Sequence, residues 1–160
     1  MPRAARWYGL AALVIVLDQL VKWAFLATFA PGERRAVTGF FNLVLVFNKG
    51  AAFSFLADAP GWQAPLLAGF AVLAAAVLSV LIFRNAQKAL FCTGLALVLG
   101  GALGNVIDRL RFGHVVDFLD FHAAGWHFPA FNVADSAITI GAALLILEGF
   151  VHEGRARAAP

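Results

Sequence analysis

The sequence predicts an all-α membrane protein of four transmembrane helices, with a small extracytoplasmic β-sheet segment and a second extracytoplasmic loop. Of its 160 residues, 62% are hydrophobic and only 13% are charged, a balance that a water-soluble domain of this size cannot bury in one core. Four separate windows reach the roughly 20 apolar residues needed to span a bilayer core of about 30 Å. We therefore expect residues 1–160 to form a single integral membrane domain.

Two charged residues in the first predicted helix, about residues 8–28, need partners inside the membrane. Asp18 and Lys22 are four residues apart, which places them on one face of the helix. An isolated charge near the middle of a bilayer costs about 2.5–3.5 kcal/mol on insertion scales, so such residues usually face protein and are paired. We predict that Asp18 and Lys22 pair with each other or with neighbouring helices, in a structural role rather than a chemical one.

The connection after this helix, about residues 29–63, predicts β-structure outside the hydrocarbon core. It is rich in Pro, Gly and Asn, and residues 40–47 (FFNLVLVF) are a run of aromatic and β-branched residues typical of a strand. The run is too short to span a membrane as a helix. We expect it to lie at the interface as a small sheet.

The charge pattern predicts the orientation of the chain. The second and third predicted helices, about residues 64–83 and 89–108, are joined by the short loop 84–88, and the fourth covers about 134–152. Four spans place both termini and this loop on one side of the membrane. Six Lys or Arg residues lie in these short flanks, against five spread over the two long connections. Because the positive-inside rule weights short flanks, we expect both termini in the cytoplasm.

The end of the third predicted helix combines small and polar residues. Gly100 and Gly104 form a small-xxx-small pair that lets another backbone come close. Asn105 and Arg109 share a face, and Arg109 lies where the helix dipole favours a cation. Packing and capping explain the glycines and Arg109, but they do not explain an asparagine one turn inside the membrane edge.

The second long connection, about residues 109–133, and the start of the fourth helix contain two candidate catalytic carboxylates. Asp117 lies among apolar neighbours, whereas a surface acid is expected in a polar loop. Asp135 has a structural explanation as well, because Asn132 suits the N-cap position and an acid in the first turn is stabilised by the helix dipole. From spacing alone, the structural and the catalytic explanations of Asp135 both stay open.

If the two aspartates converge, the pair has the chemistry to hydrolyse a peptide bond. One carboxylate accepts a proton from water, while the other, kept protonated, polarises the carbonyl and protonates the leaving nitrogen. Two like charges close together cannot both ionise cheaply, so the pair shares a proton. Our hypothesis is that the helix N-terminus keeps Asp135 ionised and apolar surroundings keep Asp117 protonated, which requires a pH–rate profile with two limbs.

Other kinds of site have little support in the sequence. No serine has a neighbouring base in a nucleophile motif, and the single cysteine, Cys92, lies in an apolar run where we expect it to pack. The second long connection holds three histidines at spacings that match no strong zinc pattern, so we expect no metal and no cofactor. These are His114, His122 and His127. Lys and Arg are scattered in ones and twos, which argues against nucleic-acid binding.

Two functions of other classes compete with a peptidase. A small oligomeric transporter or channel would line its pathway with the intramembrane carboxylates, but no repeated half with matching broken helices is present. A noncatalytic scaffold would use its polar residues only to pack helices, which leaves two aspartates at one membrane edge without a purpose. Cleavage of a peptide substrate by the purified protein separates both alternatives from a peptidase.

Five local patterns, in a fixed order, match one protein family. They are Asp18-Gln19-x-x-Lys22, Asn48-Lys49-Gly50-Ala51-Ala52-Phe53, Gly100-Gly101-Ala102-x-Gly104-Asn105-x-x-Asp108-Arg109, Val115-Val116-Asp117-Phe118 and Phe131-Asn132-x-Ala134-Asp135-Ser136. Each is a modest signal alone, but together they span most of the chain, and the length and four-helix layout agree. The sequence thus resembles the bacterial family of lipoprotein signal peptidases, also called signal peptidase II.

The resemblance implies a membrane-embedded aspartic endopeptidase that removes the signal peptide from diacylglyceryl-modified prolipoproteins, cutting before the lipidated cysteine. It implies that Asp117 and Asp135 are the catalytic dyad and that Asp18 and Lys22 support the fold, and we group Asp108 with these structural residues. It also implies a set of residues that line or order the active site. They are Asn48, Gly101, Asn105, Arg109 and Asn132.

Roles and location follow from the same resemblance. We expect Asn48 and Arg109 to orient substrate carbonyls, Asn105 and Asn132 to hydrogen-bond near the dyad, and Gly101 to allow close backbone approach. The enzyme would lie in the bacterial cytoplasmic (inner) membrane, with its active site near the extracytoplasmic face, where a signal peptide leaves the bilayer. The substrate's lipid and membrane lipid would lie between the helices. We expect the enzyme to act as a monomer.

Overall fold

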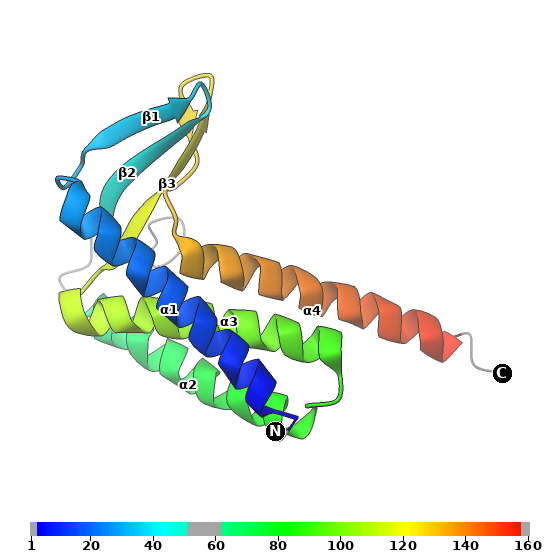
Figure 1. Cartoon of the computed structure of the whole chain (residues 1–160). Coiled ribbons are helices and arrows are strands. Elements are labelled where there is room, and N and C mark those ends of the chain that lie inside the picture. Colours follow the sequence, from blue (N-terminus) through cyan, green and yellow to red (C-terminus); the bar gives the residue numbers. More distant parts are fainter. Residues whose placement is uncertain (1–2, 51–61, 158–160) are drawn as a thin grey trace.

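Four long helices and one small sheet make up the part of the chain that the structure, a computed structural model, describes: residues 3–50 and 62–157. The helices are α1 (Ala5–Thr28), α2 (Gln63–Arg84), α3 (Ala89–Phe112) and α4 (Val133–Arg157). The strands are β1 (Arg34–Thr38), β2 (Phe41–Asn48), β3 (Val115–Ala123) and β4 (Trp126–His127). Figure 1 shows the sheet at one end of the helices, and the start of α1 and the end of α4 at the other.

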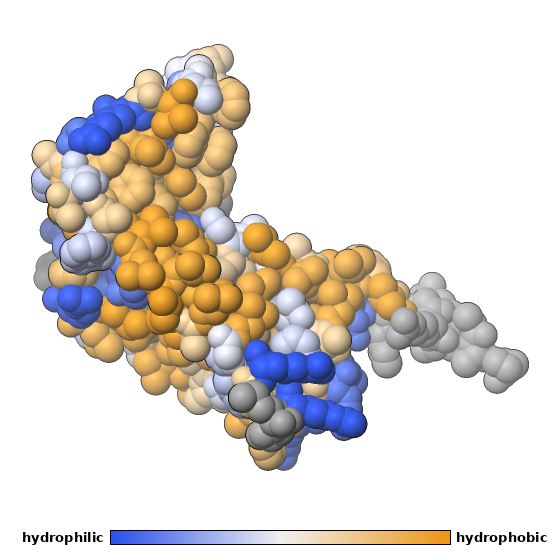
Figure 2. Space-filling model, in the orientation of Figure 1, coloured by the Kyte–Doolittle hydropathy of each residue, from blue (hydrophilic) through white to orange (hydrophobic). Residues whose placement is uncertain are grey.

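All four helices are long and apolar enough to cross a membrane, which confirms the four-helix prediction. Their outward faces carry large exposed apolar side chains, among them Trp23 of α1, Phe83 of α2 and Phe150 of α4. Figure 2 shows this apolar surface covering the helical body. A surface of this kind is a liability in water, but it matches the hydrocarbon of a bilayer, where no water needs to be excluded.

Helix α3 forms the centre of the bundle, because α1, α2 and α4 each pack against it. Glycines make the close approaches possible. A Cβ at Gly100 would lie 2.7 Å from the Ala11 carbonyl oxygen of α1, and a Cβ at Gly141 would lie 2.7 Å from the Gly94 oxygen. The predicted Gly100 and Gly104 pair therefore does face another helix, with Gly104 making room for the Asp18 carboxylate.

The end of α3 differs slightly from the prediction. The helix continues to Phe112, and Gly113 then adopts a left-handed conformation with φ of +74°. Its backbone N–H donates to the Arg109 carbonyl at 3.0 Å, which is the usual way for glycine to end a helix. Arg109 therefore lies in the last turn of α3.

The sheet combines both long connections of the chain. Its order is β1-β2-β3-β4, and all neighbouring strands are antiparallel. Strand β2 confirms the strand predicted at residues 40–47. The second connection, predicted as a loop, is instead largely strand: β3 pairs with β2, and the turn Ala124-Gly125, with both φ values positive, leads into β4 as a type I′ hairpin. Strand β1 pairs with one edge of β2, and β3 pairs with the other edge, whose backbone groups would otherwise lack partners in the sheet.

Candidate active site

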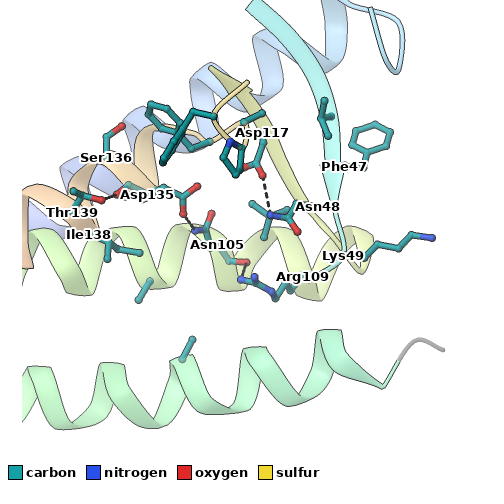
Figure 3. A pocket seen from close by; sticks show the side chains of 18 of the residues that line it. Phe47, Asn48, Lys49, Asn105, Arg109, Asp117, Asp135, Ser136, Ile138 and Thr139 are labelled. Carbon is teal, nitrogen blue, oxygen red and sulfur yellow. Dashed lines mark hydrogen bonds between the residues drawn. The ribbon is translucent and has the colours of Figure 1, made fainter. Parts of the chain in front are cut away.

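A cleft of about 880 Å³ opens where the sheet meets the helices. Its walls come from β2, β3, α2, α3, α4 and the segment 128–131 that leads into α4. The volume lies within the range of ordinary ligand sites. Five polar residues predicted for the site line the cleft, and Figure 3 shows them facing it from three sides. They are Asn48, Asn105, Arg109, Asp117 and Asp135.

Asp117 enters the cleft from β3, where its pairing with Val46 of β2 fixes its register. Only 1% of the residue is exposed. Its Oδ1 accepts a hydrogen bond of 2.7 Å from Asn132 Nδ2, and its Oδ2 accepts one of 3.1 Å from Asn48 Nδ2. Burial and then the nearby charge of Asp135 raise the pKa of Asp117 to about 7, so this carboxyl holds a proton at neutral pH far more often than an exposed aspartate.

Asp135 lies in the first turn of α4 and completes a capping box. Asn132 Oδ1 accepts a 2.9 Å bond from the Asp135 backbone N–H, and Asp135 Oδ2 accepts a 3.3 Å bond from the Asn132 backbone N–H. This is the reciprocal arrangement of an N-cap and an acid three residues later. The predicted structural role of Asp135 is therefore present. It does not exclude chemistry, because the same carboxylate lines the cleft.

Asn132 connects the two aspartates. The residue is fully buried, and it caps Asp135 through its oxygen while its Nδ2 donates to Asp117. Asn132 therefore bonds both carboxylates, that of Asp117 through its side chain and that of Asp135 through its backbone N–H. Asp117 and Asp135 line the same cleft, although 18 positions separate them in the chain.

Arg109 of α3 brings a positive charge to the wall of the cleft. Its Nη2 donates to the Gly50 carbonyl at 3.0 Å, and its Nη1 donates to the Asn105 carbonyl at 3.5 Å. The Nε atom is buried and has no hydrogen-bond partner in the described part of the chain. A buried donor without a partner is costly, which makes this guanidinium a natural binding point for a carbonyl group.

Gly101 and Asn132 lie behind the cleft wall rather than on it. A Cβ at Gly101 would collide with the backbone carbonyl of Ala134 and come within 2.7 Å of Ile138. Gly101 therefore keeps α3 in contact with the first turn of α4, which carries Asp135. This is the close backbone approach that was predicted for Gly101.

The three predicted structural residues form one buried cluster. Lys22 Nζ lies 2.8 Å from Asp18 Oδ2 and 2.8 Å from Asp108 Oδ2, and each residue is at most 2% exposed. The pairing of Asp18 with Lys22 is confirmed. The sequence did not indicate that Lys22 also reaches Asn105, at 2.9 Å, which connects this cluster to the cleft.

A second polar cluster, away from the cleft, was missed entirely. Asp120 of β3 accepts from Asn42 at 2.8 Å and lies 2.8 Å from His127 Nδ1 and 3.4 Å from Arg34 Nε. Burial acts against the charge, but these three partners outweigh it and hold the pKa of Asp120 below its ordinary value. Each strand contributes one member, so strand pairing, which single residues do not reveal, was needed to find it.

Two further points concern the predicted absence of a metal and one of the sequence patterns. Among the side chains that the structure describes, no group of three or more His, Cys, Asp or Glu residues is arranged to hold a metal ion. The last three residues of the second sequence pattern, Ala51-Ala52-Phe53, lie outside the described residues. Asn48, in the same pattern, is described and bonds Asp117.

Comparison with known proteins gives a consistent result. The model of the family described as "Signal peptidase (SPase) II" matches residues 10–151. A lipoprotein signal peptidase of Burkholderia vietnamiensis is 59% identical over 144 residues, covering 90% of this chain and 87% of its own length. One of Ralstonia nicotianae is 62% identical over 142 residues, covering 89% and 82%.

Solved structures agree with the fold. A bacterial membrane enzyme determined by the in meso method at 2.3 Å resolution matches with a TM-score of 0.84 at 29% identity, covering 94% of this chain and 91% of that one. A second, at 1.9 Å resolution, matches with a TM-score of 0.78 at 31% identity, covering 90% and 92%.

Proposed function

The chain belongs to the signal peptidase II family, and we propose that Asp117 and Asp135 are the residues with which it cuts prolipoproteins. Membership makes it an aspartic-type signal peptidase and a multi-pass protein of the bacterial inner membrane. The substrate is a diacylglyceryl-modified prolipoprotein, cleaved before its lipidated cysteine. The observation that carries the proposal is the pair of aspartates bonded to one buried asparagine at the edge of an apolar cleft.

The two aspartates divide the proton transfers between them. Ionised Asp135 accepts a proton from water, and the water oxygen attacks the carbonyl carbon of the scissile bond. Asp117, whose pKa is raised to about 7, donates its proton to the carbonyl oxygen. When the gem-diol intermediate collapses, the C–N bond breaks, Asp135 gives its proton to the leaving nitrogen, and Asp117 takes a proton from a gem-diol hydroxyl as the carboxyl C=O forms. The pair then again holds one proton, as at the start.

The supporting residues hold the reactants in place. Asn48 and Arg109 flank the cleft near Asp117, and their N–H groups suit the carbonyl oxygens of an extended substrate. Asn105 donates to Asp135 Oδ1 at 2.8 Å. Such fixed donors stabilise charge without having to reorganise during the reaction.

The apolar part of the cleft suits a lipid. Beyond the dyad, its wall includes Ala71 of α2, Ala102 of α3 and Ile138 of α4, all within helices of membrane length. A diacylglyceryl group lying there stays among apolar side chains while its cysteine reaches the aspartates. Membrane lipid fills the same space when no substrate is bound.

We infer that the sheet and the dyad lie on the extracytoplasmic side, with both termini in the cytoplasm. The sheet and the helix ends that lead to the termini lie at opposite ends of the bundle (Figure 1), and the short flanks carry the denser positive charge. Cys92 is fully buried, so a thiol reagent should not label the protein before a new cysteine is introduced. In intact spheroplasts, a membrane-impermeant maleimide should label Ala36→Cys and not Gln87→Cys; the reverse pattern inverts the topology.

The decisive experiment compares the wild type with Asp117→Asn and Asp135→Asn. Cleavage of a diacylglyceryl-modified prolipoprotein is assayed in detergent, with and without a metal chelator, and melting curves verify that each variant is folded. We expect the wild type to cleave regardless of the chelator and both folded variants to be inactive. An inert wild type, or full activity in either variant, removes the dyad and reopens the transporter alternative. If the chelator abolishes cleavage by the wild type, the metal-free mechanism is wrong.

A further inference from the structure

Lys22 makes one hydrogen bond that charge neutralisation does not explain. Its ammonium is 2% exposed and has three donors. Two of them face Asp18 and Asp108 at 2.8 Å, which already supply more negative charge than one cation needs. The third faces a neutral amide oxygen, Asn105 Oδ1, at 2.9 Å, and Asn105 is the residue that donates to Asp135.

This third bond fixes the orientation of the Asn105 amide. An ammonium group donates and never accepts, so the amide must turn its oxygen towards Lys22. Asn132 Nδ2 donates to the same oxygen at 3.2 Å. The Nδ2 of Asn105 must then point the opposite way, where it meets Asp135 Oδ1 at 2.8 Å.

Both aspartates consequently face amide N–H groups rather than amide oxygens. Asn132 Nδ2 donates to Asp117 Oδ1, while the oxygen of Asn132 is held by the Asp135 backbone N–H. During the proposed reaction each carboxyl is protonated in turn, and a protonated carboxyl is satisfied equally well by an amide oxygen. Without Lys22, the Asn105 oxygen keeps only Asn132 Nδ2, whose two N–H groups are shared among three acceptors, and Asn105 can turn over when Asp135 takes up a proton.

The acids around Lys22 hold the backbone next to each aspartate. Asp18 Oδ1 accepts from the N–H of Ala134, the residue before Asp135, at 2.9 Å. Asp108 Oδ2 accepts from the N–H of Val116, the residue before Asp117, at 3.1 Å. Lys22 therefore lies at the centre of a cluster that contacts α4 just before Asp135 and β3 just before Asp117. Lys22 itself belongs to α1, a helix that does not line the cleft.

We propose that Lys22 is a positioning residue of the peptidase: by holding the Asn105 oxygen it keeps an N–H donor on Asp135 throughout the cycle, so that Asp135 stays the base. The inference rests on the proposed function and gives Lys22 more than the structural role predicted from the sequence. Within the described residues, the charged groups that interact with it are Asp18 on α1, Asp108 on α3, Asp117 on β3 and Asp135 on α4.

The test replaces Lys22 and compares it with a matched neighbour. Lys22→Met removes the donor, and Lys22→Gln provides an amide that can donate or accept. Gln19→Met is the control, because Gln19 Nε2 bonds Asp18, Asp108 and the Gly104 carbonyl but not Asn105. All are assayed for kcat, KM, the pH profile of cleavage and melting temperature.

We expect both Lys22 variants to lose roughly 100-fold in kcat, the order that a misplaced catalytic group costs, with KM unchanged. The alkaline limb of the profile should move to higher pH, because the charge of Lys22 lowers the pKa of Asp117 and that effect is lost. Gln19→Met should melt earlier but keep the wild-type kcat and profile. Folded Lys22 variants with wild-type kcat and profile overturn the inference, as does an equal shift in Gln19→Met.

Two further arms keep the test decisive. If the single variants do not fold, Lys22→Gln combined with Asp18→Asn removes one buried charge of each sign and is judged by the same readouts. If this also fails to fold, NMR of ¹⁵N-asparagine-labelled wild type, assigned with Asn105→Asp, follows the Asn105 amide. One amide orientation throughout the titration supports the inference, and a second one appearing overturns it. An inert wild type instead overturns the proposed function.

Discussion

Replacing Asp117 with Asn should make the protein less sensitive to alkaline pH. The fold raises the pKa of Asp117 from 3.8 to about 7, so the folded protein holds a proton that the unfolded chain releases near pH 4. Stability therefore falls as pH rises through this window. About three pKa units at about 1.4 kcal/mol each give a total of about 4 kcal/mol, of which about 3 kcal/mol falls between pH 5 and pH 8.

Asn at position 117 does not titrate. From pH 5 to pH 8, the free energy of unfolding should therefore fall by about 3 kcal/mol less in the variant than in the wild type. At pH 5 it should be the less stable of the two. Asn48 and Asn132 both donate to Asp117, a replacement amide has only one oxygen to receive them, and an unsatisfied buried donor costs about 1–3 kcal/mol.

The assay is denaturation in detergent micelles, followed by tryptophan fluorescence at several pH values between 5 and 8. Groups that do not interact with Asp117 contribute equally to both proteins, so their contributions cancel in the comparison. Parallel curves for wild type and variant would show that Asp117 has an ordinary pKa, and the assignment of Asp117 as the acid would fall with it.

Three other outcomes follow from the site. Cleavage should decline on the alkaline side with a midpoint near pH 7, because Asp117 must hold a proton and its pKa is about 7; constant kcat/KM from pH 5 to 9 contradicts its role. Gly101→Ala should destabilise the fold by about 1–3 kcal/mol, and so lower the melting temperature and kcat, because its methyl meets the Ala134 carbonyl. Gly9→Ala, where a Cβ would have nothing within 4 Å, should behave as wild type. Arg109→Ala should fold and lose roughly 10- to 100-fold in kcat/KM, the value of a charged hydrogen bond; unchanged turnover removes Arg109 from the site.

The helices were predictable because the bilayer imposes length and hydrophobicity on each span separately. Strand β2 was also predictable, from a local run of aromatic and β-branched residues. Strand β3 was not, because Asp117 and Asp120 interrupt its apolar pattern and its aromatic residues also suit a headgroup region. Its assignment depends on pairing with β2, which lies about 70 positions earlier.

The site was predictable to the extent that its residues lay in recognisable patterns. The N-cap spacing of Asn132 and Asp135 is visible in the sequence, and the capping box follows it. The contact of Lys22 with Asn105, 83 positions apart, follows from the packing of α1 on α3, and no spacing rule within one helix reveals it.

The position of Asp135 in the first turn of α4 has a consequence for the insertion of the chain into the membrane during synthesis. Helix α4 follows the other three described helices in the chain, and its N-terminus is where Asn132, Asp18 and Asp135 meet. A nascent chain with three inserted spans has Asp117 but no partner for it. With Asp117 and Asp135 acting together as proposed, cleavage can begin only after α4 has been inserted.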